Sequence, residues 1–83
     1  MALEKLSVIE RKFAEENHNL IYGFLHKHGY SIEDFYSIAV FGYLKAVQAY
    51  HRTGLNGKYG FAYIAYSYMK TEIKDHFKME NRQ

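Results

Sequence analysis

The sequence predicts an all-α fold, a compact bundle of three to four helices, and three observations support this class. Apolar residues recur at spacings of three and four along most of the chain, no stretch alternates with a period of two, and proline is absent. The chain has 83 residues, of which 48% are hydrophobic and 24% charged. That balance is typical of a globular domain. We therefore expect a single helical domain over residues 1–83.

Glycines and capping residues divide the chain into three predicted helical stretches. The first covers residues 3–28, with a break near Asn17-His18-Asn19, and stops at Gly29. The second covers residues 32–51, because Ser31 is an expected N-cap and acidic residues follow in the first turn. Glycines at positions 54, 57 and 60 indicate a loop, after which the third stretch covers residues 61–79.

Two of these stretches have apolar stripes. The stripe of the third is spaced four apart and consists of Phe61, Ala65, Met69, Ile73 and Phe77. The second stretch has a stripe with small residues that allow close helix approach, namely Phe35, Ala39, Gly42, Ala46 and Ala49. Further apolar residues surround that stripe, so the second stretch is either central in the bundle or docked against a partner. Both interpretations stay open at this point.

Tyrosine is unusually frequent, with nine Tyr and six Phe in a chain that lacks Trp. One side of the third stretch and the residues before it form what we call the Tyr–Lys face, which consists of Tyr59, Tyr63, Tyr66, Lys70 and Lys74. Ser67, Tyr68 and Thr71 flank it. Rings followed by cations suit single-stranded nucleic acid, because rings stack on unpaired bases and cations neutralise phosphates. Periodicity alone favours the simpler alternative, in which the tyrosines pack against the first stretch and the lysines are solvated.

The sequence has no pattern for a metal, a cofactor or catalysis. His26 and His28 are two apart on a predicted helix and point to different sides, and no zinc motif occurs. The serines lack a nucleophile signature, and the loop at residues 54–58 is too short for a phosphate-binding loop. Cysteine is absent, no apolar run approaches the roughly 20 residues of a membrane span, and no signal peptide is recognisable. We expect a non-enzymatic cytoplasmic protein without a cofactor, a metal or a membrane partner.

Several short motifs occur in an informative order. They are Asn19-Leu20-Ile21, Glu33-Asp34-Phe35 and Gly42-Tyr43-Leu44-Lys45-Ala46-Val47, followed after the loop by Phe61, Ala65, Tyr66, Met69, Lys70, Glu72 and Ile73. In this order and spacing the chain, from about residue 13 to residue 83, resembles region 2 of the sigma-70 family of bacterial RNA polymerase subunits. Each motif alone is loose, and the specificity of the resemblance comes from their combination.

The resemblance implies two binding surfaces. The second stretch would dock on the clamp helices of the RNA polymerase β′ subunit through Asp34, Ser37, Ile38, Val40 and Leu44. The third would capture flipped bases of promoter DNA, on the non-template strand of the −10 element. The residues on that side would be Tyr59, Phe61, Tyr63, Ile64, Tyr66, Ser67, Tyr68, Lys70, Thr71 and Lys74. Phe61 thus has two candidate roles, in the core and at the strand.

Three positions depart from the family pattern. The usual Gln-Glu-Gly is Ser37-Ile38-Ala39, and the paired tryptophans of primary sigma factors are Ser67 and Tyr68. The tyrosine that stacks on a flipped adenine aligns with Ile64, where Tyr63 or Tyr66 would substitute. These departures indicate an alternative or mobile-element sigma factor, or one with a divergent promoter.

The resemblance leaves two questions of context open. The helix-turn-helix that reads the −35 element would follow residue 83, so we expect a domain of a longer sigma factor rather than a stand-alone regulator. The main alternative function is a helical protein-interaction module that binds no DNA, such as a sigma-like decoy or the partner of an anti-sigma factor. A duplex-binding helix-turn-helix is disfavoured, because its turn has only about 3–4 residues.

Overall fold

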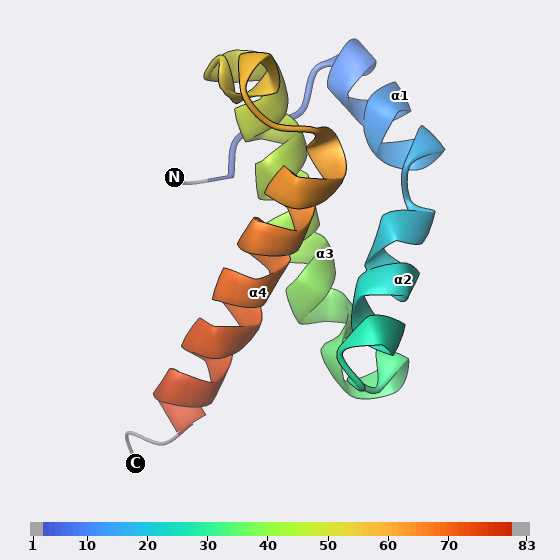
Figure 1. Ribbon diagram of the computed structural model, residues 1–83, viewed down its shortest axis with the longest axis vertical. Helices are drawn as coiled ribbons and strands as arrows, with labels where there is room; N and C mark the ends of the chain where they lie inside the picture. The colour runs from blue at the N-terminus through green and yellow to red at the C-terminus, as the bar shows by residue number, and fades with distance from the viewer. Residues whose placement is uncertain (1–2, 81–83) are drawn as a thin grey trace.

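The computed structural model describes residues 3–80, apart from the side chains at positions 55 and 80. Within this range the elements follow in the order α1 (Val8–Glu16), α2 (Asn19–Lys27), α3 (Ile32–Arg52), the 3-10 turn η1 (Leu55–Gly57) and α4 (Phe61–Glu80). Residues 3–80 contain no strand. The predicted all-α class is therefore confirmed, and the four helices form one bundle (Figure 1).

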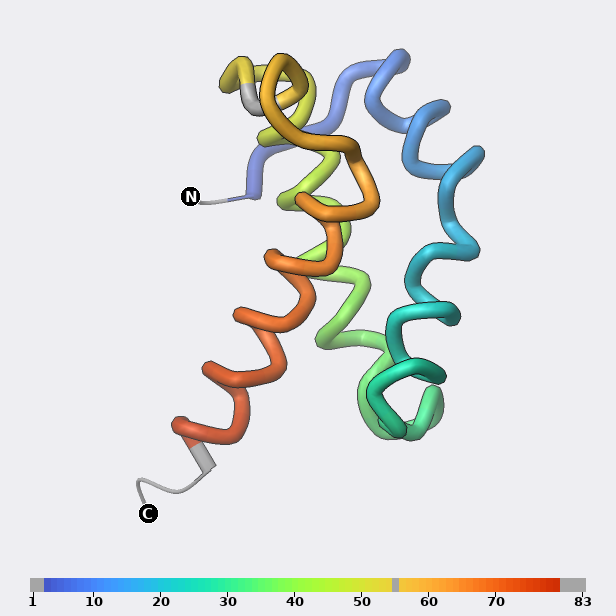
Figure 2. The backbone as a smooth tube through the Cα atoms, viewed as in Figure 1, coloured from blue at the N-terminus to red at the C-terminus, as the bar shows by residue number. Residues whose placement is uncertain are grey.

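Helix α3 is the centre of this bundle. It runs antiparallel to α4, and α1 and α2 form a bent column on its other side (Figures 1 and 2). Its small residues Ala39, Ala46 and Ala49 are fully buried, as is Val47. The central position explains why apolar residues surround most of this helix.

The first predicted stretch is two helices, with the break where it was expected. Asn17 caps the end of α1 and its side-chain amide donates to the Phe13 carbonyl at 2.9 Å. The expected start at residue 3 was wrong, because α1 begins only after Ser7. The Ser7 hydroxyl accepts from the Glu10 N–H, and the Glu10 carboxylate accepts from the Ser7 N–H at 2.8 Å. This reciprocal capping box ends the extended segment and starts the helix.

Most of the predicted α4 stripe is buried. Ala65, Met69 and Ile73 are at most 1% exposed, and Phe61 is also in the core. Phe77 departs from the prediction, since it is 39% exposed and contacts the rings of Tyr30 and Phe35 at the edge of the core.

An ion pair joins the start of α1 to the end of α3. Glu10 is only 4% exposed, and Arg52 donates to its two carboxylate oxygens from Nε and Nη2, each at 2.8 Å. The hydrogen bonds from Arg52 hold the pKa of Glu10 at about 2, below its usual 4.5, with a further contribution from the Ser7 N–H. Burial acts in the opposite direction but is the weaker influence.

We expect Glu10→Gln to remove an acid-sensitive part of the stability. A carboxyl whose pKa is lower in the folded state stabilises the fold above its unfolded pKa, and this contribution is lost as pH falls. For Glu10 the loss falls between about pH 4.5 and pH 2. The free energy of unfolding of the variant should therefore be lower than that of the parent at neutral pH, and the two curves should converge towards pH 2. Urea unfolding at a series of pH values measures both; parallel curves would contradict the assignment.

Candidate nucleic-acid and protein interfaces

Two exposed tyrosines stack at the start of α4. The ring centroids of Tyr59 and Tyr63 are 4.9 Å apart with an interplanar angle of 19°. The side chains remain 45% and 62% exposed. The two stacked rings therefore lie at the surface, where their exposed parts can contact a further flat ring.

Tyr66 lies one turn further along, between α4 and α2. Its ring meets Phe24 edge-on at 5.3 Å, and the Lys27 Nζ lies 5.8 Å from its centroid. A hollow of about 300 Å³ opens here, lined by Phe24, His28, Ala62, Tyr63, Tyr66, Ser67 and Lys70. Its walls are aromatic on both sides, and cationic or polar groups lie at its rim. The alternative in which the tyrosines pack against the first predicted stretch holds in part for Tyr66, but not for the exposed Tyr63.

The contributions of α2 to this hollow were missed by sequence reasoning. Residues 27 and 28 fall at the end of the first predicted stretch, and His28 was otherwise considered only as a metal ligand, whereas helix packing places Lys27 and His28 against α4. No local pattern could have indicated this, because the contact joins residues about 40 positions apart.

The remaining residues of the predicted strand side differ in accessibility. Lys70 and Lys74 are exposed and form no ion pair within residues 3–80. The Thr71 hydroxyl donates to the Ser67 carbonyl at 2.9 Å, so its proton is used within the helix. Tyr68 is half-buried against the core and borders a shallow depression with Ser67 and Thr71.

Two of the predicted strand residues belong to the core instead. Phe61 is 9% exposed, and its ring packs edge-on against Phe13, Tyr43 and Tyr50 at centroid distances of 4.7, 5.7 and 5.3 Å. Ile64 is 3% exposed. We therefore assign both to the core, because neither side chain reaches the surface at the Tyr–Lys face.

The residues predicted to contact polymerase lie on the outer side of α3. Asp34 and Ser37 are exposed, whereas Ile38, Val40 and Leu44 are half-buried. Sequence reasoning missed Phe41, which is 42% exposed between them and carries the Lys45 Nζ 4.4 Å above its ring. Helical spacing could have identified Phe41, since positions 37, 41 and 44 share one side of a helix. We call the exposed side formed by Asp34, Ser37, Phe41 and Leu44, edged by Ile38 and Val40, the docking face.

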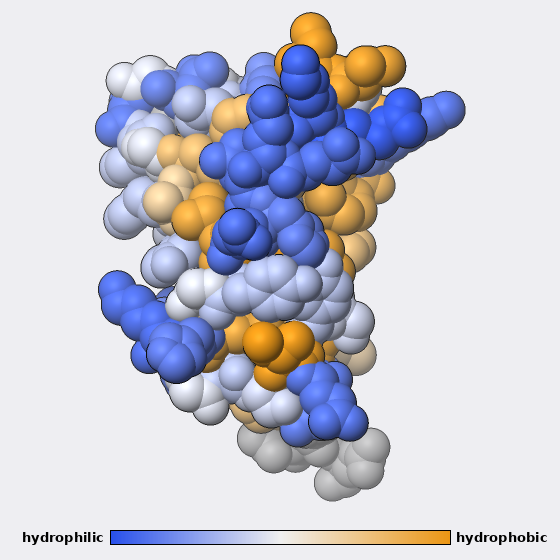
Figure 3. All heavy atoms as spheres, turned by 90° about the vertical axis from the view of Figure 1, so that its right-hand side faces the viewer, coloured by the Kyte–Doolittle hydropathy of each residue, from blue (hydrophilic) through white to orange (hydrophobic). Residues whose placement is uncertain are grey.

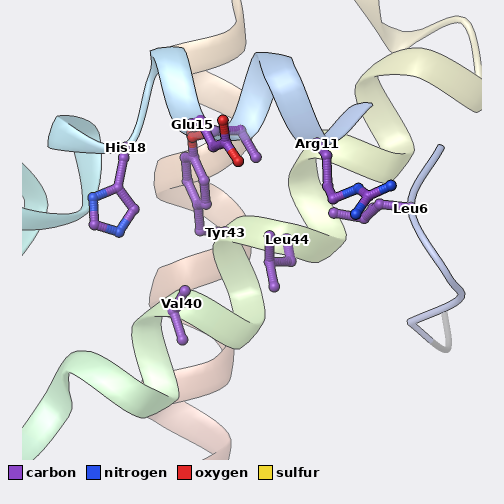
Figure 4. Close-up of a pocket in the computed structure, with 8 residues that line it drawn as sticks. Leu6, Arg11, Glu15, His18, Val40, Tyr43 and Leu44 are labelled. Atoms are coloured by element: carbon purple, nitrogen blue, oxygen red, sulfur yellow. The ribbon is translucent and has the colours of Figure 1, made fainter. Parts of the chain in front are cut away.

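A hollow flanks the docking face on each side. Between α1 and α3 lies one of about 480 Å³, lined by Leu6, Arg11, Ala14, Glu15, His18, Val40, Tyr43 and Leu44 (Figure 4). Between α3 and α4 lies another of about 350 Å³, lined by Ser37, Ile38, Phe41, Glu72, Asp75, His76 and Met79. The docking face is therefore a largely apolar ridge between two depressions, a shape that suits the side chains of a facing helix.

Tyr43 closes the floor of the first hollow. Its hydroxyl donates to the Ala14 carbonyl at 2.7 Å, and burial raises its pKa to about 12. The phenol is therefore neutral at physiological pH and has a structural role. Charged groups stand at the rim instead, where Arg11 and Glu15 of α1 are exposed. Figure 3 shows hydrophilic residues over much of α1 and α2, with apolar residues at the surface on either side.

Residues 3–80 contain neither a cluster of three or more metal-ligating side chains nor a helix that is long and apolar enough to span a membrane.

Comparison with protein-family models, with curated proteins and with solved structures found no match. The class of protein is therefore defined by the fold and its surfaces alone. It is a small all-α bundle with the aromatic and cationic Tyr–Lys face on α4 and a largely apolar exposed face on α3.

Proposed function

We propose that this chain is a transcription initiation module of the sigma region 2 type. It docks on the β′ clamp helices of RNA polymerase through the docking face and engages the melted −10 promoter strand through the Tyr–Lys face. The observation that carries the proposal is the exposed Tyr59–Tyr63 stack next to the Tyr66 hollow, with the exposed lysines Lys70 and Lys74 one and two turns on. The resemblance of the ordered motifs to sigma region 2 supports it independently.

The chemistry of the Tyr–Lys face matches an unpaired strand. Stacking of a base on an aromatic side chain is worth about 1–3 kcal/mol, comparable with the few kcal/mol needed to unstack a base. The exposed rings of Tyr59 and Tyr63 offer such stacking. Lys70 and Lys74 can then neutralise successive phosphates without first breaking an ion pair to a side chain within the described residues 3–79. The module binds and orients a strand, and no step of this function needs a catalytic group or a cofactor.

We expect Tyr63→Ala and Tyr66→Ala each to weaken binding to a −10-like single strand. The loss of one stacking contact, about 1–3 kcal/mol, corresponds to roughly 5- to 150-fold in affinity. Fluorescence anisotropy with a labelled oligonucleotide measures this, with the protein alone and with the protein bound to core polymerase. Tyr22→Ala is a matched control, because Tyr22 is 38% exposed on α2 outside the Tyr–Lys face. Unchanged binding by both α4 variants would contradict the proposal that these aromatic rings stack on DNA bases.

Lys70→Ala should act differently from the tyrosine variants. A phosphate contact carries no base information, so affinity should fall uniformly across strand sequences. The slope of log affinity against log salt should become shallower by about 0.7, the value for one phosphate contact on a single strand. Lys12→Ala, at an exposed position of α1, should leave the slope unchanged. Equal slopes for Lys70→Ala and the parent would show that Lys70 contacts no phosphate.

The alternative, a helical protein-interaction module without DNA binding, has one observation in its favour. The formal net charge of the chain is only +2, which is weak for a protein that binds nucleic acid on global electrostatics alone. A salt titration that compares single-stranded with duplex DNA separates the possibilities. Polymerase binding without affinity for either form of DNA would favour the alternative.

A further inference from the structure

The segment before α1 lies across the side of α3. Residues 3–7, which we call the strap, have no regular secondary structure and run past α3 before the chain turns into α1 (Figure 1). The Glu4 N–H donates to the Gln48 Oε1 at 2.8 Å. The Lys5 carbonyl accepts from the Arg52 Nη2 at 3.0 Å. The strap is thus held by its main chain to two successive turns of α3.

These contacts continue the line of the docking face. Positions 41, 44, 48 and 52 are three or four apart and share one side of a helix. Phe41 on this line is 42% exposed, whereas the polar Gln48 two turns on is only 1% exposed. Leu6 of the strap also lines the same hollow as Val40 and Leu44, and Figure 4 shows it beyond Leu44 on the side of Arg11. The strap therefore covers the second half of a surface whose first half is open.

The strap residues before Ser7 can lift without dismantling α1, because the capping box that starts this helix begins at Ser7. The side chains of Glu4, Lys5 and Ser7 are exposed, and Leu3 and Leu6 are only half-buried. The stronger anchor is the Glu10–Arg52 ion pair, which joins α1 to α3. Of the strap side chains, the Glu4 carboxylate lies near this pair, 3.7 Å from Arg52. Segments with few buried apolar contacts and exposed main-chain hydrogen bonds open at low free-energy cost.

We infer that the strap is an autoinhibitory cover over the docking face, displaced when a partner helix binds along α3. This inference rests on the proposed function of that face. With the strap in place, a facing helix meets α3 only around Ser37 to Leu44. With the strap lifted, the contact extends to Gln48, about 16 Å from Ser37 at 1.5 Å per residue. Binding then carries the cost of strap opening, and affinity depends on the fraction of molecules in which it is open.

A reversible crosslink tests the inference on the whole chain. The parent has no cysteine, so Glu4→Cys combined with Gln48→Cys can form a single disulfide that closes the strap. Oxidation should weaken binding to core RNA polymerase by about tenfold or more, and reduction should restore it. The two single-cysteine variants, treated with the same oxidant, are the controls. Equal or tighter binding by the oxidised double variant overturns the inference, whereas absence of binding by the reduced variant and by the parent overturns the proposed function itself.

Hydrogen exchange of the parent chain gives a second test that needs no substitution. The Glu4 N–H is hydrogen-bonded in the free protein. If the strap is displaced, this amide should exchange faster in the polymerase complex, while amides of α3 exchange more slowly. Unchanged or increased protection at Glu4 in a complex that does form would also overturn the inference.

Discussion

Gly42→Ala is expected to destabilise the bundle by about 1–3 kcal/mol, the usual cost of adding a methyl group to a packed core. At position 42 an added Cβ would lie 2.8 Å from the Tyr68 carbonyl oxygen and 2.9 Å from the Met69 Cα. Both are backbone atoms of α4, so no side-chain rotation relieves the overlap and the two helices must separate. The melting temperature should fall by roughly 4–8 °C for each kcal/mol lost. Thermal unfolding followed by circular dichroism measures the change.

Gly23→Ala is the matched control for this prediction. Gly23 is also a helical glycine, but an added Cβ there meets only the Tyr66 hydroxyl, at an ordinary 3.7 Å. Alanine is favoured over glycine within a helix by about 1 kcal/mol. The same substitution should therefore stabilise at position 23 and destabilise at position 42. A stabilised Gly42→Ala variant would show that α3 and α4 can separate at little cost.

The elements that were predicted well depend on local chemistry. Ser31 caps α3, which covers Ile32–Arg52 against an expected 32–51, and α4 covers Phe61–Glu80 against an expected 61–79. Capping residues, glycines that end helices, and apolar residues spaced four apart are all local sequence features. They can therefore be recognised without knowledge of any tertiary contact. The overlooked start of α1 had a local signature too, in Ser7 and Glu10.

The differences arise where tertiary geometry decides. Phe77 continues the apolar stripe of α4, but α4 and α3 diverge towards that end (Figure 1), so Phe77 is left 39% exposed. Phe61 and Ile64 fit the strand side by resemblance, yet the rotation of α4 about its axis turns both into the core. Periodicity gives the relative directions of side chains along a helix, and only the neighbouring helices determine which direction is the surface.

The same reasoning applies to the two candidate interfaces. The order of rings and lysines along α4 could be predicted from spacing, but the part that α2 takes in the Tyr66 hollow could not. On α3, the predicted contact residues share one region of the surface. Phe41 lies in that region and is 42% exposed, but it was not distinguished from the many other apolar residues of this central helix. Because the Phe41 side chain is exposed on this surface, a substitution at Phe41 is the strongest test of docking.

Phe41→Glu is expected to weaken association with the β′ clamp helices by at least about 30-fold, which corresponds to the 2 kcal/mol of a strong interface residue. A buried charge at the centre of an apolar ridge cannot be paired by a helix that presents apolar side chains. Leu44→Glu should have a similar effect, and Asp34→Arg should abolish association by reversing the charge at the exposed end of the face. Pull-down and titration with core polymerase measure all three.

The choice of variants separates loss of docking from loss of folding. Phe41 and Asp34 are at the surface, so circular dichroism should show their variants folded, whereas half-buried Leu44 also contacts the core. Ile9→Glu is the control, because Ile9 is 73% exposed on α1 and lines neither hollow beside the docking face. It introduces the same charge on an apolar residue that is even more accessible than Phe41, and it should leave polymerase binding unchanged. If folded Phe41→Glu and Asp34→Arg bind as the parent does, then α3 is not the docking surface and its apolar circumference serves the bundle alone.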